Sequence, residues 1–224
     1  MAKISLFIGG ISALPNSGRP TAMFKQLTVG PLELGPEGFI GDEQADRRVH
    51  GGPEKAVHLY PAAHYAKLAE RFPEAASQLI PGSLGENISC AELDESSVRI
   101  GDIYRLGSAR LQVCQPRNPC WKIDDRFNAD GMAAFIAETN LTGWYWRVVQ
   151  AGSVPPGAML EPDEAAASAL SLAAAMTLWQ EHRPQPDDLE KLAATPGIAS
   201  GWQEKILNRA AWLRQQFHVK PATP

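Results

Sequence analysis

Short apolar runs separated by turn-forming residues recur along most of the chain. They have the length of strands, and several are rich in the β-branched or aromatic residues that favour strands. These runs cover residues 4–8, 23–34, 56–60, 87–90, 102–106, 110–114 and 144–149. The pattern predicts a mainly β architecture.

Two segments depart from the strand pattern. A helix is expected over residues 61–72 and another over residues 131–139, because their apolar positions recur at helical spacing. Helices inserted between strands suit a closed or partly closed β-barrel with helices packed on its outside. We therefore expect an α+β, barrel-like domain over residues 1–162.

The composition changes over residues 163–224, which are rich in alanine, leucine and glutamine and show no strand-like alternation. Ser171 is suited to cap the start of a helix over residues 172–180. Asp187-Asp188 open a second helix, and Ser200 is placed to cap a third. The sequence predicts a small three-helix tail.

The last helix of this tail carries one apolar stripe. Trp202, Ile206, Ala210, Leu213 and Phe217 follow the i, i+4, i+8, i+11, i+15 spacing that places side chains on one face. We expect the stripe to be buried against the other two helices. A docking face for a partner protein is the alternative.

Composition narrows the class of protein. The chain has 224 residues, of which 44% are hydrophobic and 21% charged, and no apolar run approaches the roughly 20 residues that span a bilayer. The first ten residues lack the long apolar core and cleavage site of a signal peptide. Three widely spaced cysteines do not form the framework of a secreted scaffold. We expect a soluble, cytoplasmic protein.

The charge balance bears on partners. A formal net charge of −4 argues against a broad surface for nucleic acid or an anionic membrane. A small anionic ligand needs only a local cluster of cations. Candidates for such a cluster are Arg19, Lys25, Arg47, Arg48, Lys55 and Arg117.

The first informative motif is the pair GFIGDEQAD, residues 38–46, and HGGPEKAV, residues 50–57. Adjacent glycines between His50 and a proline form a tight turn in which backbone N–H groups can approach a ligand closely. Lys55 would add a point charge beside it. Taken alone, His-Gly-Gly-Pro is more often merely a turn.

A second motif, GENIS, covers residues 85–89. The carboxylate of Glu86 and the carboxamide of Asn87 stand at the start of a strand. They are suited to the edge of a heterocycle, because asparagine offers both a donor and an acceptor. Taken alone, a solvated strand start is the favoured interpretation.

The third motif, QPRNPC, ends at Cys120. Proline is favoured at a helix start, and a cysteine directly after Pro119 would lie in the first turn, where free N–H groups and the helix dipole stabilise a thiolate. Cys120 is therefore a candidate soft-metal ligand or nucleophile. Cys90 and Cys114 lie in strand-like runs and are expected to be buried structural thiols.

Two other uses of Cys120 stay open at this point. Zinc could bind through Cys120 with His50 or His58, although no CxxC or HExxH spacing supports a zinc site. A Cys-His-Asp hydrolase triad needs only that its members meet in space. No local hydrolase signature supports it.

Together and in this order, GxxGDEQAD, HGGPEKAV, GENIS, the Gly101-Asp102 pair and QPRNPC resemble the MOSC domain, the C-terminal domain type of molybdenum-cofactor sulfurases. The resemblance spans roughly residues 15–160. The tail resembles the three-helix extension of the YiiM-like branch of that family. The resemblance implies a β-barrel that holds molybdenum cofactor (Mo-molybdopterin), with Cys120 as the one protein ligand to the metal.

The same resemblance implies an activity. Similar proteins reduce N-hydroxylated compounds, including 6-hydroxylaminopurine, to amines. The chain shows no GxGxxG or Fe–S cysteine spacing, so an external electron donor is expected, and a flavoprotein reductase is the natural candidate. Besides Cys120, the residues expected at the cofactor are Arg19, Thr21 and Lys55 at its phosphate end, Arg117 and Asn118 at the pterin or metal end, and His50 and Asn87 in orienting roles.

Two alternatives to a reductase remain. One is a sulfur carrier that uses a Cys120 persulfide, which is reasonable for an accessible thiol and requires a sulfur-donating partner. The other is a non-catalytic module that binds a pterin or phosphate ligand and docks through its helical tail. The second predicts that Cys120→Ala leaves ligand binding nearly intact.

Overall fold

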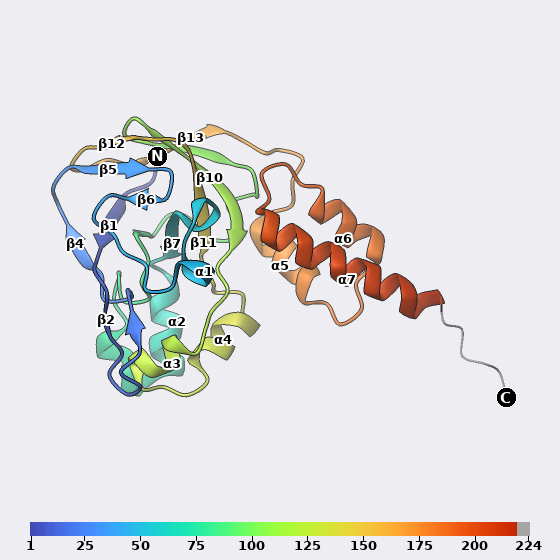
Figure 1. Cartoon of the computed structure of the whole chain (residues 1–224), viewed down its shortest axis with the longest axis horizontal. Coiled ribbons are helices and arrows are strands. Elements are labelled where there is room, and N and C mark those ends of the chain that lie inside the picture. The colour runs from blue at the N-terminus through green and yellow to red at the C-terminus, as the bar shows by residue number, and fades with distance from the viewer. Residues whose placement is uncertain (219–224) are drawn as a thin grey trace.

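A curled body of strands and a projecting bundle of helices make up the protein (Figure 1). The computed structural model describes residues 1–218. The mixed α+β class and the barrel-like sheet expected from the sequence are confirmed. Within residues 1–218, no helix has both the length and the apolar character needed to cross a membrane.

The body is built on one eight-stranded sheet with the order β13-β9-β10-β11-β7-β8-β1-β4. Neighbouring strands are antiparallel except β7 and β8, which are parallel. The strands are β1 (Ile4–Ile8), β4 (Gln26–Thr28), β7 (Val57–Pro61), β8 (Ile88–Cys90), β9 (Ile103–Leu106), β10 (Ala109–Pro116), β11 (Trp144–Gln150) and β13 (Leu160–Glu164).

The sheet curls back on itself. Ala2, just before β1, exchanges two backbone hydrogen bonds with Leu160 of β13, at 2.8 and 3.0 Å. These bonds join the two sides of the sheet and make it a partly closed barrel. Two small sheets complete the body: β12 (Gly152–Val154), β5 (Leu32–Gly35) and β6 (Gly38–Phe39) form one, and β2 (Ser12–Ala13) and β3 (Pro20–Thr21) form the other.

One predicted strand is divided. The apolar run expected over residues 23–34 becomes β4 and β5, which belong to different sheets. The break falls at Gly30 and Pro31, and the proline has no N–H to donate to a strand ladder. The other predicted runs lie in strands whose ends shift by one or two residues.

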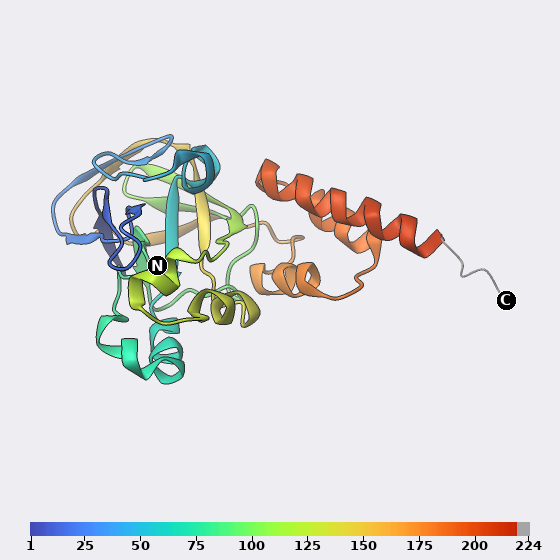
Figure 2. The ribbon, with the colours of Figure 1, turned by 60° about the horizontal axis from the view of Figure 1, so that its bottom comes forward.

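The two helices predicted within the barrel region are present as α2 (His64–Arg71) and α4 (Met132–Glu138). They lie at one end of the barrel with a third short helix (Figures 1 and 2). This end has its own apolar core, which includes Leu68, Phe127 and Ile136. The third helix is α3 (Lys122–Phe127), which follows the helix start expected at Pro119. The short elements that the sequence did not predict are α1 (Arg47–His50) and the 3-10 helices Pro53–Lys55 and Pro73–Gln78.

The tail consists of α5 (Leu172–Gln180), α6 (Pro186–Ala193) and α7 (Ser200–His218). As predicted, Ser171 caps α5, its Oγ accepting from the N–H of Ala174 at 3.2 Å. The apolar stripe of α7 is buried with the other tail helices: Trp202, Ile206, Ala210 and Leu213 are at most 7% exposed. The side chain of Phe217, the last member of the stripe, lies outside the described side chains.

The tail is joined to the barrel by backbone hydrogen bonds. The N–H of Leu172 donates to Val98 at 2.8 Å, and that of Ala199 donates to Cys114 at 2.9 Å. The last strand of the sheet reaches Glu164, slightly past the predicted boundary after residue 162. The division into a barrel domain and a tail domain stays a prediction.

Gly38, in β6, provides a test of how closely this strand packs against Ala56, just before β7. Its φ is +120°, and a Cβ there would lie 2.3 Å from the carbonyl oxygen of Ala56. Gly38→Ala should therefore lower the free energy of unfolding by more than about 2 kcal/mol, measured by urea denaturation. Gly30→Ala is the control, because a Cβ at that position would meet nothing within 4 Å. Equal effects of the two substitutions would contradict the packing described.

Candidate functional site

Cys120 lies in the connection between β10 and α3, two residues before the helix. The helix begins at Lys122 with Trp121 as its N-cap residue, so the expectation that Cys120 sits in the first turn is wrong. The chain up to Arg117 still follows the sheet, its N–H donating to Gly143 at 3.1 Å. The thiol therefore stands on a loop, and its surroundings come from side chains more than from a helix dipole.

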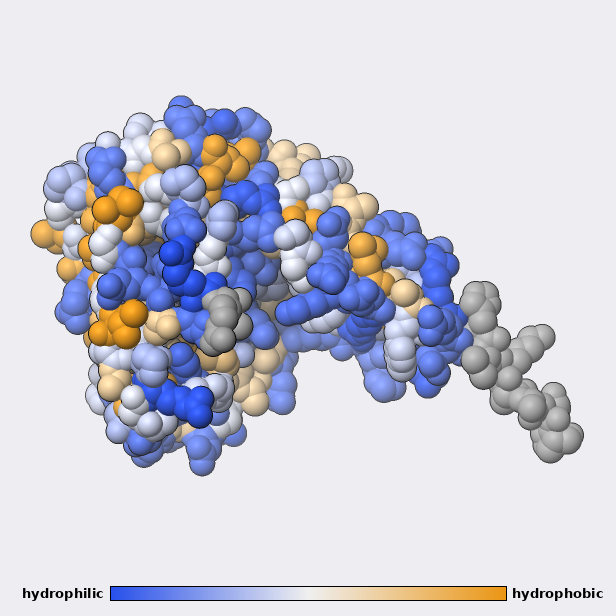
Figure 3. All heavy atoms as spheres, viewed as in Figure 1, coloured by the Kyte–Doolittle hydropathy of each residue, from blue (hydrophilic) through white to orange (hydrophobic). Residues whose placement is uncertain are grey.

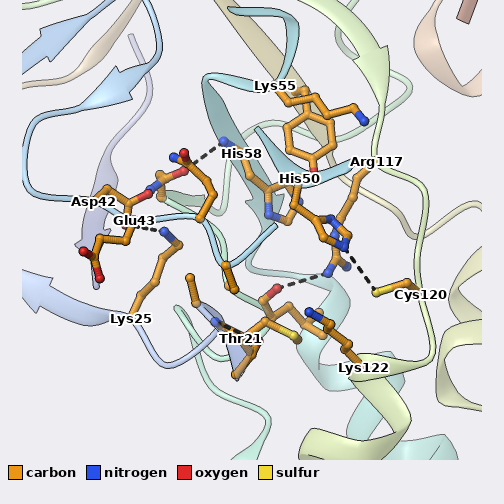
Figure 4. A pocket seen from close by; sticks show the side chains of 18 of the residues that line it. Thr21, Lys25, Asp42, Glu43, His50, Lys55, His58, Arg117, Cys120 and Lys122 are labelled. Atoms are coloured by element: carbon orange, nitrogen blue, oxygen red, sulfur yellow. Dashed lines mark hydrogen bonds and ion pairs between the residues drawn. The ribbon is translucent and has the colours of Figure 1, made fainter. Parts of the chain in front are cut away.

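Two cavities meet at this thiol. An inner pocket of about 80 Å³ reaches into the barrel, and an outer mouth of about 640 Å³ opens on the side of the tail. Cys120, His50 and Lys55 line both. Figure 4 shows Arg117, His50 and Cys120 pointing toward one another, with Lys55 and Lys122 on opposite sides of them. Hydrophilic residues dominate the centre of this face of the molecule (Figure 3).

His50 lies beside the thiol, its Nε2 4.0 Å from the Sγ of Cys120. Burial, followed by the charges of Arg117, Lys122 and Lys55, lowers the pKa of His50 from 6.5 to about 4. The ring is thus neutral at pH 7. The thiolate–imidazolium pair of a cysteine hydrolase is not favoured here.

Arg117 forms the floor of the inner pocket. The residue is only 7% exposed, and its Nη2 donates to the carbonyl of Leu84 at 3.3 Å. Its Nη1 has no hydrogen-bond partner among the described residues. A buried donor without a partner is costly, so this position is suited to an oxygen-rich or anionic ligand.

His58 also lines the inner pocket and carries a buried polar atom. The residue is 4% exposed, and its Nε2 has no partner in the part of the chain that the structure describes. Burial, reinforced by the charges of Arg117 and Lys25, holds the pKa of His58 well below its usual range. A neutral imidazole therefore borders the pocket.

The GDEQAD run supports the pocket from below. Asp42 forms a buried ion pair with Lys25 and accepts from the Nδ2 of Asn87 at 2.8 Å. The same Nδ2 donates to Phe7 at 3.2 Å, and the Oδ1 of Asn87 accepts from the N–H of His58 at 3.1 Å. Asn87 lines the pocket, but its side-chain hydrogen bonds go to neighbouring protein groups and hold them in place.

Glu86 is fully buried. The interpretation of the GENIS motif as a solvated strand start is therefore wrong. Its carboxylate accepts from the hydroxyl of Tyr65 at 2.5 Å and from the N–H groups of Gly82 and Leu84 at 2.6 and 3.1 Å. Burial raises the pKa of Glu86. The residue fixes the loop whose Leu84 carbonyl accepts from Arg117.

The structure divides the six candidate cations. Lys25 is paired with Asp42, and Arg47 is paired with Glu37 at the surface, while the side chain of Arg48 lies outside the described side chains. Lys25 nevertheless lines the inner pocket, and the remaining three cations also reach the site. Arg19 and Lys55 line the outer mouth, and Arg117 lines the inner pocket.

Lys205, on α7, also lines the outer mouth and was missed by the sequence analysis. Burial, and then the charge of Lys205, lower the pKa of Lys55. Glu54 holds the helix in place, its carboxylate accepting from the N–H and Oγ of Ser200, each at 2.9 Å, and from Arg147 at 2.7 Å. Residues so far apart in the chain carry no joint sequence signal.

Comparison with known proteins agrees with this arrangement. Residues 46–161 match the family model of the MOSC domain. The chain is also 37% identical over 207 residues to Protein YiiM of Escherichia coli strain K12, covering 92% of this chain and 91% of that protein. The chain belongs to the MOSC domain family.

Other relatives extend the comparison. The uncharacterized protein YflK of Bacillus subtilis is 33% identical, covering 92% of this chain and 93% of that protein. A protein of Gibberella moniliformis named Reductase is 36% identical over 138 residues, which cover 61% of this chain and 24% of that protein. Its likeness is therefore limited to part of a longer chain.

Solved structures show the same fold. The crystal structure of YiiM from Escherichia coli matches with a TM-score of 0.79 and 28% identity, covering 94% of this chain and 92% of that one. YiiM from Geobacillus stearothermophilus matches with a TM-score of 0.77 and 28% identity, covering 92% of this chain and 97% of that one. Both likenesses extend over the helical tail as well as the MOSC domain.

The three residues expected at the phosphate end of the cofactor do not form a single cluster. Thr21 is 1% exposed and lines the inner pocket, where its Oγ1 accepts from the N–H of Met23 at 3.3 Å. Arg19 is exposed at the outer mouth, with its guanidinium 5.6 Å from the centre of the Trp121 ring. Lys55 alone of the three borders both spaces.

The other thiols of the MOSC domain are buried, as predicted. Cys90 is 1% and Cys114 is 0% exposed. Burial raises the pKa of both thiols, that of Cys114 to about 12. Within the described residues, no group of three or more His, Cys, Asp and Glu side chains is arranged to hold a metal. The zinc alternative therefore lacks a third ligand beside Cys120 and His50.

The depressed pKa of His50 predicts its pH dependence. Its ring signals in NMR spectra should stay in the neutral form from pH 7.5 down to about 5, where an ordinary histidine has already titrated near 6.5. Lys122→Met should raise the midpoint because it removes a neighbouring cation, whereas Lys3→Met, at an exposed and distant position, should not. As the pH falls, His50 takes up a proton in the unfolded chain before it does so in the folded protein. The free energy of unfolding should therefore decrease as the pH drops from 6.5 toward 4. A midpoint at or above 6.5 would contradict the site's electrostatics.

Proposed function

We propose that this protein is a molybdenum-cofactor-dependent reductase that converts N-hydroxylated compounds, such as 6-hydroxylaminopurine, to amines. The observation that carries the proposal is the position of Cys120, a partly exposed thiol at the meeting point of a cation-lined mouth and an inner pocket with an unpartnered arginine donor. Membership of the MOSC domain family and likeness to a fungal protein named Reductase support it.

The site fits the cofactor in three respects. A thiolate is a soft ligand of the kind molybdenum accepts. The outer mouth, at about 640 Å³, has the size of a cofactor cavity. The cofactor is anionic, and the mouth carries Arg19, Lys55, Lys122 and Lys205.

We assign each candidate cofactor-binding residue a role from its position in the two cavities. We assign Arg19 and Lys55 to the phosphate end at the outer mouth, and Thr21 to the wall of the inner pocket. Arg117 offers its unpartnered N–H to the polar atoms of the cofactor, and Asn118 borders the mouth beside Cys120. His50 orients the ligand as a neutral ring, while Asn87 acts through His58.

The reaction cleaves the N–O bond, consumes two electrons and two protons, and releases an amine and water. The cofactor supplies the two-electron redox chemistry when bound. His50 is neutral at pH 7 and holds no imidazolium proton to give, so protons enter through the open mouth. The electrons come from an external donor, for which a flavoprotein reductase is our candidate. Three free cysteines suit a reducing compartment, the cytoplasm.

The test compares wild type, Cys120→Ala and Cys90→Ala, all purified from a host that makes molybdenum cofactor. Wild type should contain near-stoichiometric molybdenum, measured by mass spectrometry, and pterin, measured by fluorescence after oxidation. Cys120→Ala should lose the metal and more than about 100-fold of 6-hydroxylaminopurine reduction, since even partners of metal ligands contribute roughly 10- to 100-fold. Cys90→Ala, a buried thiol away from the pocket, should retain both.

Other outcomes would favour the alternatives. Wild type without metal or pterin, with extra sulfur on Cys120 in its intact mass, would replace the reductase with a sulfur carrier. Pterin that is bound equally by wild type and Cys120→Ala, without reduction in either, would indicate a non-catalytic binding module. Either result would contradict the proposed function.

A further inference from the structure

Two exposed tryptophans have no role in the cofactor site described above. Trp121, directly after Cys120, lines the outer mouth and is 48% exposed. Trp212, on α7, is 57% exposed. Tryptophan is enriched in protein–protein interfaces, where it supplies much of the binding energy. The two side chains therefore direct attention to the surface around the mouth.

The position of Trp212 follows from the helix that carries it. Lys205, which lines the mouth, Asn208 and Trp212 have the i, i+3, i+7 spacing that places side chains on one side of a helix. All three residues are exposed, and Trp212 lies about 10 Å beyond Lys205 along the axis, at 1.5 Å per residue. In Figures 1 and 2, α7 runs from the barrel toward the free end of the tail. This side of α7 therefore adjoins the mouth.

Trp121 borders the same opening from the barrel. It lines the mouth together with Lys205, so a residue of the barrel and a residue of the tail face one space. The guanidinium of Arg19 lies 5.6 Å from the centre of the Trp121 ring, yet nearly half of the tryptophan still faces solvent. We call the surface formed by Trp121, Lys205, Asn208 and Trp212 the rim.

The mouth beside the rim is cationic in a protein whose formal net charge is −4. Four cations and one carboxylate line it: Arg19, Lys55, Lys122, Lys205 and Asp46. A bound phosphate brings at most about two negative charges, so the cations remain in excess when the cofactor is loaded. An acidic protein is thus attracted to this opening and repelled by the chain as a whole, which orients its approach.

The tail helix continues this pattern away from the mouth. Residues 205–218 contain no Asp or Glu. Of the three cations in this stretch, Arg214 is paired with acids of α6, and Arg209 donates to backbone carbonyls at the end of α5. Lys205 is the one that lines the mouth. An acidic partner lying along this stretch of α7 meets no carboxylate of the helix.

The reaction proposed above defines the chemistry of such a partner. Cleavage of one N–O bond to an amine and water consumes two electrons and two protons, and one reduced flavin releases two electrons and two protons as it is oxidised. The electrons must reach the centre beside Cys120, so their donor has to dock close to the mouth. Electron-transfer encounters are transient and bury less than about 1,200 Å², so the mouth is open to substrate between them.

We propose that the rim is the docking surface of the electron donor, and that this donor is a flavoprotein whose flavin lies within an acidic face. Trp121 and Trp212 supply the aromatic contacts, and the cations of the mouth orient the partner. The helical tail thereby serves electron delivery, while the barrel holds the cofactor. This assignment rests on the reductase function proposed above and names the binding surface and the charge of its partner.

Two adjacent positions of α7 provide matched variants. Asn208→Glu places a negative charge on the rim. Leu207→Glu places the same charge at an exposed position on another side of the helix, because one residue turns an α-helix by about 100°. Trp212→Ala removes one aromatic contact of the rim, and Leu207→Ala is its control.

The measurement is binding of flavodoxin, a small acidic flavoprotein, to the cofactor-loaded proteins by isothermal titration calorimetry. Wild type should bind saturably, with a Kd that rises between ~20 mM and ~200 mM salt as charges are screened. Asn208→Glu and Trp212→Ala should each raise the Kd at least about fivefold, and both Leu207 variants should bind as wild type does. No saturable binding by wild type, or equal weakening by the two glutamate substitutions, would overturn the proposal.

Reduction of 6-hydroxylaminopurine separates this proposal from the proposed function. Reduced flavodoxin is compared with reduced methyl viologen, a small donor that needs no docking surface. If Asn208→Glu raises the KM for flavodoxin and leaves the methyl viologen rate unchanged, both proposals are supported. If methyl viologen drives reduction but flavodoxin does not, or serves Asn208→Glu and Leu207→Glu equally, the rim assignment fails while the reductase stands. If neither donor drives reduction but Asn208→Glu alone weakens flavodoxin binding, the reductase fails while the rim stands as a flavoprotein surface.

Discussion

Positive charge gathered around one thiol is the constraint on which the rest of this site depends. Arg117, Lys55 and Lys122 act on the same neighbour, His50, and together with burial they lower its pKa to about 4. A fourth cation, Lys205, acts on Lys55. Holding like charges this close costs free energy that an anionic ligand would recover, because opposite charges interact strongly in a partly buried space.

The acids of the surrounding motifs serve the architecture. Asp42 is paired with Lys25, Glu86 accepts from Tyr65 and from two backbone N–H groups, and Glu54 holds the first turn of α7. Their carboxylates are thereby engaged by neighbouring groups, while the loops they fix place Arg117 and α7 at the site. The acidic residues of the GDEQAD, GENIS and HGGPEKAV motifs thus contribute mainly by positioning other residues of the site.

Local signals in the sequence predicted local structure well. Strand runs, the cap at Ser171 and the burial of Cys90 and Cys114 follow from neighbouring residues alone. The site was predicted only in part. Cys120 and Arg117 lie within one short motif. Lys205 reaches the mouth because the tail docks against the barrel, and the periodicity of the tail helices does not predict that docking. The late start of α3 depends on pairing with the sheet, which spacing from a proline does not reveal.

The central claim is that Cys120 ligates the metal of a bound cofactor, and X-ray absorption at the molybdenum edge tests it most directly. In the wild-type, cofactor-loaded protein, the account predicts three sulfur neighbours to molybdenum, two from the pterin dithiolene and one from the thiolate. A spectrum with only two sulfur neighbours, unchanged in Cys120→Ser, would contradict it.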